Sequence, residues 1–533
     1  MEFITLTSLL TGAITLGGYL LTLPKGATKK DKLATGEIKD KKELKNMIGT
    51  DGLRLTKNIK LNQKFDFEGT CTIAPTGAGK TTSFFIPNLL DKNIKGSIVV
   101  TDPKGELFKL TSNFQEKECK RKVIVLNPLD PKKSEGYNPL EQCKDTSEVL
   151  QLSSLILYNG SLAIELMTGK KSGGAEWVDM ATPLLSAALL WCKSKGIGTI
   201  ENAFKLIINT KTKDLDLLMA SADEDTQTQY NIFKTVGGAD RTTGSIKITL
   251  ATNLKLFTDK KICEVSKRTT FDPNILREKE CIIYVIYPER KSAYLAPYMS
   301  VFFSQIFDNV LDNYNKKAKA IHFLFDEFAN IGLINNMSIN AATVRSRQIS
   351  LNVCLQSISQ LEQVYGKENS KAILNNLKTK IILGGLSDIE TLRFFSELCG
   401  KQNIILENKS KNKNNETKSY SNSSKNVLST DEIRRLKDNE VLLILHNKQP
   451  VLCEKNLYFT DKNYLNKIHE TELPIKNITD RNIKTLEEVF KKELIIAKEK
   501  EAQREKEENQ NDSNKFINQD ISNSIEDYFN NGK

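Results

Sequence analysis

The stretch APTGAGKT, from Ala74 to Thr81, decides the fold expected of this chain. It follows the apolar run from Thr70 to Ala74, which is typical of a buried β-strand, and it precedes TTSFFIPNLL, which is typical of a helix. A glycine-rich turn between strand and helix is the context of a phosphate-binding loop, because backbone N–H groups converge on an anion there. The usual pattern begins with glycine, and the small residue Ala74 takes that place here. The sequence therefore predicts a nucleotide-binding domain.

The residues of this loop have distinct expected roles. Gly77 and Gly79 let backbone N–H groups turn inward around the phosphates. Lys80 reaches the β- and γ-phosphates, and Thr81 offers its hydroxyl to Mg²⁺. We therefore expect ATP and Mg²⁺ as the bound groups. The predicted nucleotide-binding residues are Thr76, Gly77, Ala78, Gly79, Lys80, Thr81 and Thr82.

The second half of such a site is an acidic residue at the end of an apolar strand, and HFLFDEFANIG supplies one. Asp326 is expected to hold the metal ion together with Thr81, and Glu327 to orient or activate the attacking water. The alternative is an Asp-Glu pair that caps a following helix. The predicted catalytic set thus begins with Lys80, Asp326 and Glu327.

Two arginines and a glutamine flank a further strand in ATVRSRQISLNVCLQS. In ring-shaped nucleotide motors a glutamine at a strand end senses the γ-phosphate. An arginine from the neighbouring subunit stabilises the transition state there, worth on the order of 10³ or more in rate for GTPase-type fingers. We assign these roles to Gln356 and Arg345, and favour Arg345 over Arg347. The alternative is that the arginines lie on a solvated face and that Gln356 is an ordinary strand end.

Short apolar runs recur along the chain and favour an α/β fold. Continuous runs rich in β-branched residues suit a parallel sheet that is covered on both faces. The expected strands are Thr70 to Ala74, Ser97 to Thr101, Val123 to Leu126, Cys281 to Tyr287, His322 to Phe325, Ile349 to Leu355, Lys380 to Leu383 and Val441 to Leu445.

The spacing of apolar residues changes between Leu140 and about Lys255, where it becomes helical. The phosphate-binding domain is therefore expected in two pieces, 51–139 and 256–475, with an inserted all-α domain at 140–255. Within the second piece, Glu407 to Asn426 consists almost wholly of Asn, Lys, Ser, Thr and Glu, which predicts a mobile exposed loop. Residues 476–533 are expected to form a charged helix and a disordered tail.

The N-terminal stretch from Phe3 to Leu23 carries no charged residue. As a helix it would rise about 31 Å, roughly the thickness of a bilayer's hydrocarbon core. The sequence thus predicts one transmembrane helix within 1–24, and the alternative is a buried core helix. The lysine-rich linker at 25–50 follows it, so the positive-inside rule places the bulk of the chain on the cytoplasmic side of the cell membrane.

Composition indicates the kind of partner and disfavours two kinds of cysteine site. The net charge of +11 fits a partner that carries phosphates, either nucleic acid or an anionic membrane surface. The nine cysteines include no C-x-x-C pair, which disfavours a disulfide framework or a zinc site. The histidines, His322, His446 and His469, lack a second ligand at zinc-type spacing.

Several motifs together resemble a known family. TDPKGELF at Thr101 to Phe108, LFDEFANIG at Leu324 to Gly332, and ATVRSR with QSISQLEQVYG within Ala342 to Gly366 look like the TraG/TraD-type coupling proteins of type IV secretion and conjugation. KIILGGLSDIETLRFFSELCG at Lys380 to Gly400 and LSTDEIRRL at Leu428 to Leu436 extend the likeness. The resemblance covers roughly Lys45 to Tyr464.

This resemblance implies a RecA-like motor domain with an inserted all-helical domain, assembled as a hexamer at the inner face of the membrane. It implies as partners a relaxase-bound DNA strand, other relaxosome proteins and the channel proteins of the secretion system. Lys80 and Thr81, Asp326 and Glu327, and Gln356 match family positions. Asp102 and Lys104 match a motif beside the phosphate loop. The family usually has two membrane spans, whereas one is found here, and the tail after Asn509 matches no motif.

Three functions are consistent with these motifs. The leading hypothesis is an ATP-driven coupling protein that moves DNA. A second is a substrate receptor in which nucleotide acts only as a switch. A third is an FtsK-like chromosome motor, which the DEFANIG and ATVRSR stretches disfavour because they resemble the coupling proteins specifically.

Overall fold

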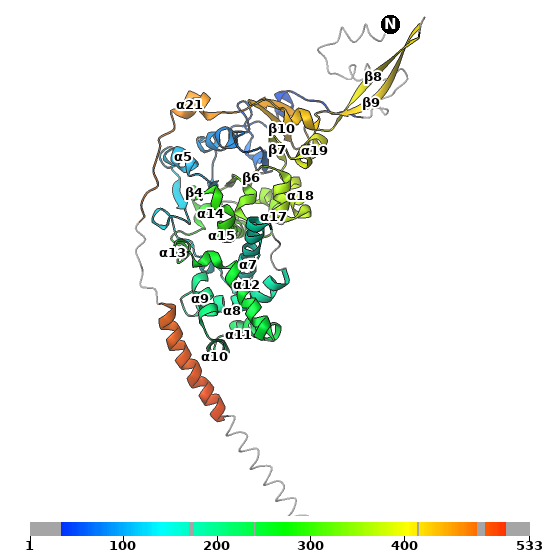
Figure 1. The fold of residues 1–533 in the computed structure, drawn as a ribbon. Helices are drawn as coiled ribbons and strands as arrows, with labels where there is room; N and C mark the ends of the chain where they lie inside the picture. Colours follow the sequence, from blue (N-terminus) through cyan, green and yellow to red (C-terminus); the bar gives the residue numbers. More distant parts are fainter. Residues whose placement is uncertain (1–33, 170–174, 239, 413–414, 477–484, 508–533) are drawn as a thin grey trace, which may run out of the picture. The chain divides into compact units, whose positions relative to one another are not determined.

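The computed structural model describes residues 34–169, 175–238, 240–412, 415–476 and 485–507. The chain divides into two compact units, and each is treated by itself. The first unit comprises Met1–Leu126, Pro273–Arg290 and Ile306–Pro474, and the remaining residues make up the second. Figure 1 gives the element labels used below.

The first unit is built on a nine-stranded sheet in the order β11-β10-β7-β1-β6-β5-β2-β4-β3. Strands β1 to β7 run parallel to their neighbours, whereas β10 is antiparallel to β7 and β11 is antiparallel to β10. The strands are β1 Thr70–Ile73, β2 Ser97–Asp102, β3 Lys122–Leu126, β4 Cys281–Ile286, β5 Ile321–Phe325, β6 Ile349–Leu355, β7 Thr379–Leu383, β10 Glu440–Leu445 and β11 Val451–Glu454.

The expectation of an α/β fold is confirmed, and each expected strand is present within two residues of its predicted ends. One difference is that β10 closes the sheet in the antiparallel sense, with Leu442 opposite Ile382. A continuous apolar run does not carry strand direction, because both faces are buried whichever way the strand runs. The edge strand β11 was not expected, since it is only four residues long and its apolar run covers just three of them.

Helices surround the central strands of this sheet. The apolar faces of α5 and of the helix after β1 meet the sheet in one large core that includes Phe85, Leu107 and Tyr284. The helices of the first unit are α3 Gln63–Asp66, α4 Ile86–Leu89, α5 Glu106–Lys117, α14 Ile275–Glu278, α16 Met337–Thr343, α17 Ile358–Tyr365, α18 Lys367–Asn376, α19 Ile389–Leu398, α20 Thr430–Arg434 and α21 Lys462–Leu465.

The order of the strands positions the predicted site. Four central strands lie side by side in the order β1-β6-β5-β2 and run parallel. Their carboxyl ends therefore lie at the same edge of the sheet. The phosphate loop follows β1, Gln356 follows β6, Asp326 follows β5, and Asp102 ends β2. Ligands of open α/β sheets bind at this edge, because loops and helix N-termini converge there.

The described elements of the second unit are helices. They are α6 Pro139–Gln142, α7 Thr146–Thr168, α8 Ala175–Ser194, α9 Ile200–Asn209, α10 Thr212–Ala220, α11 Glu224–Gly237, α12 Asp240–Asn253, α13 Lys260–Val265, the first part of α15 Ser292–Asp312, and a helix over residues 486–507. Side-chain caps begin several of them. Asp145 accepts a hydrogen bond from the N–H of Glu148 at the start of α7, and Thr199 accepts one from Asn202 at the start of α9.

Among the described helices, α7 is long and apolar enough to cross a bilayer by length and composition alone. Half of its most apolar window is buried, and it packs against α8 and α12. A core helix of a helical domain has the same features. The transmembrane helix predicted at Phe3 to Leu23 lies outside the described residues, as does the predicted tail beyond residue 507.

The stretch from Glu407 to Asn426, for which the sequence predicts a mobile exposed loop, is paired in strands over its described part. Strands β8, Lys401–Asn412, and β9, Asn415–Asn426, pair antiparallel in one continuous register from Lys401 opposite Asn426 to Asn412 opposite Asn415. They form a separate two-stranded sheet, drawn in yellow in Figure 1. Composition does not predict this pairing, because main-chain hydrogen bonds hold such a ribbon together, and these need no apolar side chains.

Candidate active site

The phosphate loop turns sharply between β1 and the helical turn η3, Thr81–Phe85. Gly77 and Gly79 have φ angles of 80° and 90°, the left-handed region that favours glycine. A Cβ atom at Gly77 would meet nothing within 4 Å among the described residues, so the backbone conformation, and not lack of space, requires glycine there. The Ser83 hydroxyl donates to the carbonyl of Gly79 at 2.6 Å and fixes the start of the helix.

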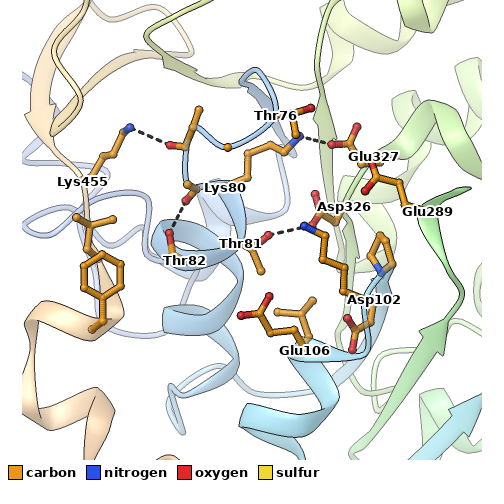
Figure 2. A pocket seen from close by; sticks show the side chains of 18 of the residues that line it. Thr76, Lys80, Thr81, Thr82, Asp102, Glu106, Glu289, Asp326, Glu327 and Lys455 are labelled. Atoms are coloured by element: carbon orange, nitrogen blue, oxygen red, sulfur yellow. Dashed lines mark hydrogen bonds and ion pairs between the residues drawn. The ribbon is translucent and has the colours of Figure 1, made fainter.

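Lys80 forms a buried ion pair with the Oε1 atom of Glu327, as Figure 2 shows. Their side chains are only 6% and 9% exposed. Burial opposes the charge on Lys80 and is the largest single effect, but the nearby acidic groups, Glu327 foremost, together outweigh it, and the pKa of the amine is raised. Without a bound phosphate, Glu327 thus acts as the counter-ion of the loop lysine.

Glu327 also accepts a hydrogen bond from the Nε2 atom of Gln356 to its Oε2 atom, at 3.0 Å. One carboxylate therefore joins the end of β5 to the end of β6 and to the phosphate loop. Glu327 has φ 58° and ψ 58°, a left-handed conformation that is unfavourable for a residue with a side chain. Backbone strain of this kind is held at functional sites, where the surrounding structure fixes the residue.

Asp326 lies beside Thr81, whose hydroxyl donates to the Oδ2 atom at 3.2 Å. Thr101 on β2 holds the backbone of Asp326, accepting from its N–H at 2.7 Å and donating to its carbonyl at 3.1 Å. The Oδ1 atom is buried and has no hydrogen-bond partner among the described residues. Burial raises the pKa of this carboxyl to about 6, although the positive charge of Lys80 lowers it.

These oxygen atoms fit a magnesium ion. Mg²⁺ prefers hydroxyl and carboxylate oxygens together with water and substrate phosphates. The Thr81 hydroxyl and the unpartnered Oδ1 atom of Asp326 supply such a set at one end of the phosphate loop. A cation there would also remove the cost of burying the Asp326 charge.

Asp102 lines the same cleft, and the structure shows a local role that the sequence did not suggest. Its Oδ2 atom accepts from the N–H of Phe108 at 2.8 Å, at the start of α5. Burial raises the pKa of Asp102 to about 6, whereas hydrogen bonds from backbone N–H groups, that of Phe108 foremost, lower it. Asp102 therefore shapes the turn that brings Lys104 and Glu106 to the cleft wall.

Arg345 does not lie in the cleft with the other predicted residues. It belongs to the turn η8, Val344–Arg347, which precedes β6, whereas Gln356 follows that strand. Seven residues of β strand span about 23 Å. The Nη1 atom of Arg345 pairs instead with the Oε1 atom of the buried Glu68 at 3.1 Å. Arg277 donates to the carbonyl of Arg347 at 3.0 Å and anchors the same turn.

The cleft has a volume of about 600 Å³. Beyond the expected residues it is lined by Glu289, by Asp438 just before β10, and by Lys455, Leu457 and Phe459 after β11. The Nζ atom of Lys455 donates to the carbonyl of Ala78 in the phosphate loop at 2.9 Å. Sequence reasoning missed these residues, because they belong to no motif, and Lys455, Leu457 and Phe459 come to the loop only through the return of the chain after β11.

Comparisons with known proteins agree with this arrangement. The family model described as type IV secretory system conjugative DNA transfer matches residues 25–501. Protein VirD4 of Agrobacterium fabrum is 25% identical over 399 residues, 73% of this chain and 58% of that protein. Conjugal transfer protein TraG of Escherichia coli is 24% identical over 64% of this chain and 56% of its own length. The chain thus spans less than two thirds of the length of these relatives.

Solved structures show the same fold. The trigonal form of the conjugative coupling protein TrwBdeltaN70 with sulphate superposes with a TM-score of 0.63 at 16% identity, covering 86% of this chain and 98% of that one. TrwB in complex with ADP and Mg²⁺ gives a TM-score of 0.60 at 16% identity, covering 81% and 96%. The chain accordingly has the mixed α/β fold of these coupling proteins. With its family model matched over most of its length, the chain belongs to the type IV secretory system conjugative DNA transfer family.

Proposed function

We propose that this chain is the membrane-anchored coupling ATPase of a conjugative type IV secretion system. In this role it recruits a relaxase-bound DNA strand, with other relaxosome proteins, and drives it toward the channel proteins by hydrolysing ATP. The observation that carries the proposal is the shared carboxylate of Glu327, which contacts both Lys80 and Gln356 beside the Thr81–Asp326 pair. Membership of the family and the ADP and Mg²⁺ bound to TrwB support it.

The contacts of Glu327 suggest how binding prepares hydrolysis. A bound γ-phosphate competes with Glu327 for the Lys80 amine, because both are anions and the lysine is their common partner. When Lys80 turns to the phosphate, the Glu327 carboxylate is freed to accept a proton from an attacking water. Gln356 stays on the Oε2 atom and holds the carboxylate in place. Residues Thr76 to Gly79 and Thr82 provide the backbone cradle.

Thr81 and Asp326 are proposed to hold the metal ion, which would neutralise charge on the β- and γ-phosphates. Arg345 is proposed to act on the site of a neighbouring subunit in a hexameric ring, since in its own chain it lies at the opposite end of β6. We further propose the transmembrane helix at Phe3 to Leu23 and an inserted helical domain at 140–255, consistent with the helices α7 to α12.

A transfer assay with Lys80→Ala tests the proposal. Expressed in place of the wild-type chain, the variant should lose DNA transfer altogether, because Lys80 is the phosphate contact of the loop. Lys92→Ala, which changes an exposed lysine after the same helix, is the matched control and should transfer normally. Normal transfer by Lys80→Ala would contradict a motor, and a division defect on deletion of the gene would favour an FtsK-like function.

A substrate receptor with a nucleotide switch is the second candidate. The observation that favours it is a set of large apolar side chains exposed on the helical unit, including Met167 at 55% and Ile248 at 68%. Contiguous exposed apolar patches mark protein docking sites, and we propose that these side chains contribute to one. A receptor should still bind relaxase and support partial transfer with Lys80→Ala, whereas a motor should bind relaxase without transferring DNA.

A further inference from the structure

The cleft has a second end that the proposed hydrolysis does not use. It is lined by Asp438, which precedes β10 in the chain, and by Lys455, Leu457 and Phe459, which follow β11. None of these residues contributes to the contacts among Lys80, Asp326, Glu327 and Gln356 described above. An elongated ligand held by the phosphate loop would nevertheless have to pass along them.

The phosphate loop gives the cleft a direction. Lys80, Thr81 and Asp326 mark the end where the β- and γ-phosphates and the metal ion belong. In Figure 2, Asp326 and Glu327 lie on one side of the loop, and Thr82 and Lys455 lie on the other. The turn η9, Tyr458–Thr460, packs against η3 on that second side. A nucleotide whose γ-phosphate sits near Glu327 therefore carries its nucleoside toward η9.

Phe459 presents an aromatic ring at this end. Its side chain is 52% exposed, although phenylalanine is among the residues most often fully buried. The Tyr458 ring meets it edge to face, at 5.6 Å between centroids and 82° between planes. An edge-to-face neighbour leaves a face of a ring open to a flat partner. Leu457, which is half-buried, adds an apolar wall beside it.

Lys455 ties this segment to the loop. Its Nζ atom donates to the carbonyl of Ala78 at 2.9 Å. Burial lowers the pKa of Lys455, and the nearby carboxylate of Asp438 acts in the opposite direction. This hydrogen bond fixes the position of Leu457 and Phe459, two and four residues further along the chain, relative to the phosphate loop.

We propose that Phe459 and Leu457 form the nucleobase subsite of this cleft, with the base stacked on the Phe459 ring and Lys455 positioning the segment. The inference rests on the proposed function, since it assumes that a nucleoside triphosphate binds at the phosphate loop. Stacking uses the π-face that every base has, so it adds affinity for the nucleoside without choosing strongly among purines.

Comparing ATP with tripolyphosphate, which has the phosphates but no nucleoside, tests the subsite. In the full-length protein with Mg²⁺, Phe459→Ala should raise the Kd of ATP by about tenfold or more and leave the Kd of tripolyphosphate unchanged. KM for ATP should rise with it, while kcat at saturating ATP stays the same. Tyr420→Ala removes an equally exposed aromatic side chain outside the cleft and should change neither Kd.

A second variant reports on the base directly. In Phe459→Trp, ATP should change the fluorescence of the introduced indole and tripolyphosphate should not, because only ATP carries a base to stack. Equal ATP affinity in Phe459→Ala and wild type, or an equal loss for both ligands, would overturn the subsite and leave the proposed function standing. If the wild-type chain bound neither ligand, the proposed function itself would fail, and the subsite with it.

Discussion

At the scale of single residues, Glu327 links the phosphate loop to the ends of strands β5 and β6. Its two oxygens contact different partners, Lys80 and Gln356, and its backbone is held in a left-handed conformation. Among the described residues, Glu327 is the ion-pair partner of Lys80. The residue therefore serves as counter-ion before nucleotide binds and as the proposed base afterwards.

Glu327→Gln separates these two roles. The amide keeps the shape of the side chain but cannot accept the proton of water, so kcat for ATP should fall by about 10² to 10⁴. Binding of ATP should be retained, because Lys80 loses a competing anion. Turnover and the Kd of ATP measure the two effects, and Glu368→Gln on the exposed surface is the control. Turnover close to that of the wild type would remove Glu327 from the mechanism.

Asp326 makes the unliganded site sensitive to pH. Its pKa is raised from 3.8 to about 6 by burial, so the folded state binds a proton more tightly than the unfolded state does. Stability from this group is therefore present at low pH and is lost as the pH rises through about 6. Without Mg²⁺ and nucleotide, Asp326→Asn should stabilise the protein at pH 8 by roughly 1 to 3 kcal/mol.

Thermal unfolding of wild type and Asp326→Asn across pH 5 to 8 measures this effect. The difference between them should shrink as the pH falls below about 6, where the wild-type carboxyl is protonated. Added Mg²⁺ with ATP should stabilise only the wild type. A constant difference at every pH would show that the charge of Asp326 is not the cause.

At the scale of elements, strand β6 has a residue with a proposed function at each of its ends. The turn with Arg345 precedes it and Gln356 follows it, and the buried Glu68 holds the arginine through an ion pair of 3.1 Å. Glu68 also faces the Nδ1 atom of His446 at 3.3 Å. A shift of β6 would therefore move Gln356, the proposed γ-phosphate sensor, and Arg345, the proposed trans-acting arginine, together.

The β8–β9 ribbon is an element that the cleft does not need. Its strands pair with each other in a sheet of their own, and it contributes no residue to the cleft lining. Replacing residues 403–424 by a short glycine linker should leave basal ATP hydrolysis within about twofold of the wild type. Steady-state turnover measures this, and a loss comparable to that of Glu327→Gln would show that the ribbon supports the site.

The local motifs were readable from the sequence, and the contacts made by distant segments were not. The phosphate loop and Asp326 with Glu327 follow strands, so their edge of the sheet could be predicted. Phe459 could not, because it reaches the cleft through the return of the chain past the edge strand β11. The pairing of Arg345 with Glu68 was hidden because it depends on β1 lying beside β6 in the sheet. The pairing of β8 with β9 could not be predicted, because main-chain hydrogen bonds form it and the polar side chains do not indicate it.

At the scale of the whole molecule, the proposed ring requires that Arg345 complete the site of another copy. Arg345→Ala alone should then lose turnover by about 10³. Mixing that variant with Lys80→Ala should restore activity. In a mixed ring, the Arg345→Ala subunit supplies an intact Lys80 and a neighbouring Lys80→Ala subunit supplies an intact Arg345 to the same cleft. Turnover of the mixture, compared with the two variants apart and with Arg393→Ala as the control, measures this. Additive activities in the mixture would place Arg345 in a role within its own subunit.

The proposal that this chain uses ATP to move DNA is tested most directly by ATP turnover of the full-length protein with and without DNA. We predict turnover that DNA raises severalfold, that weakens as salt rises because phosphate contacts are screened, and that Lys80→Ala abolishes. Turnover no higher than that of Lys80→Ala, with single- or double-stranded DNA at every salt concentration, would contradict the account.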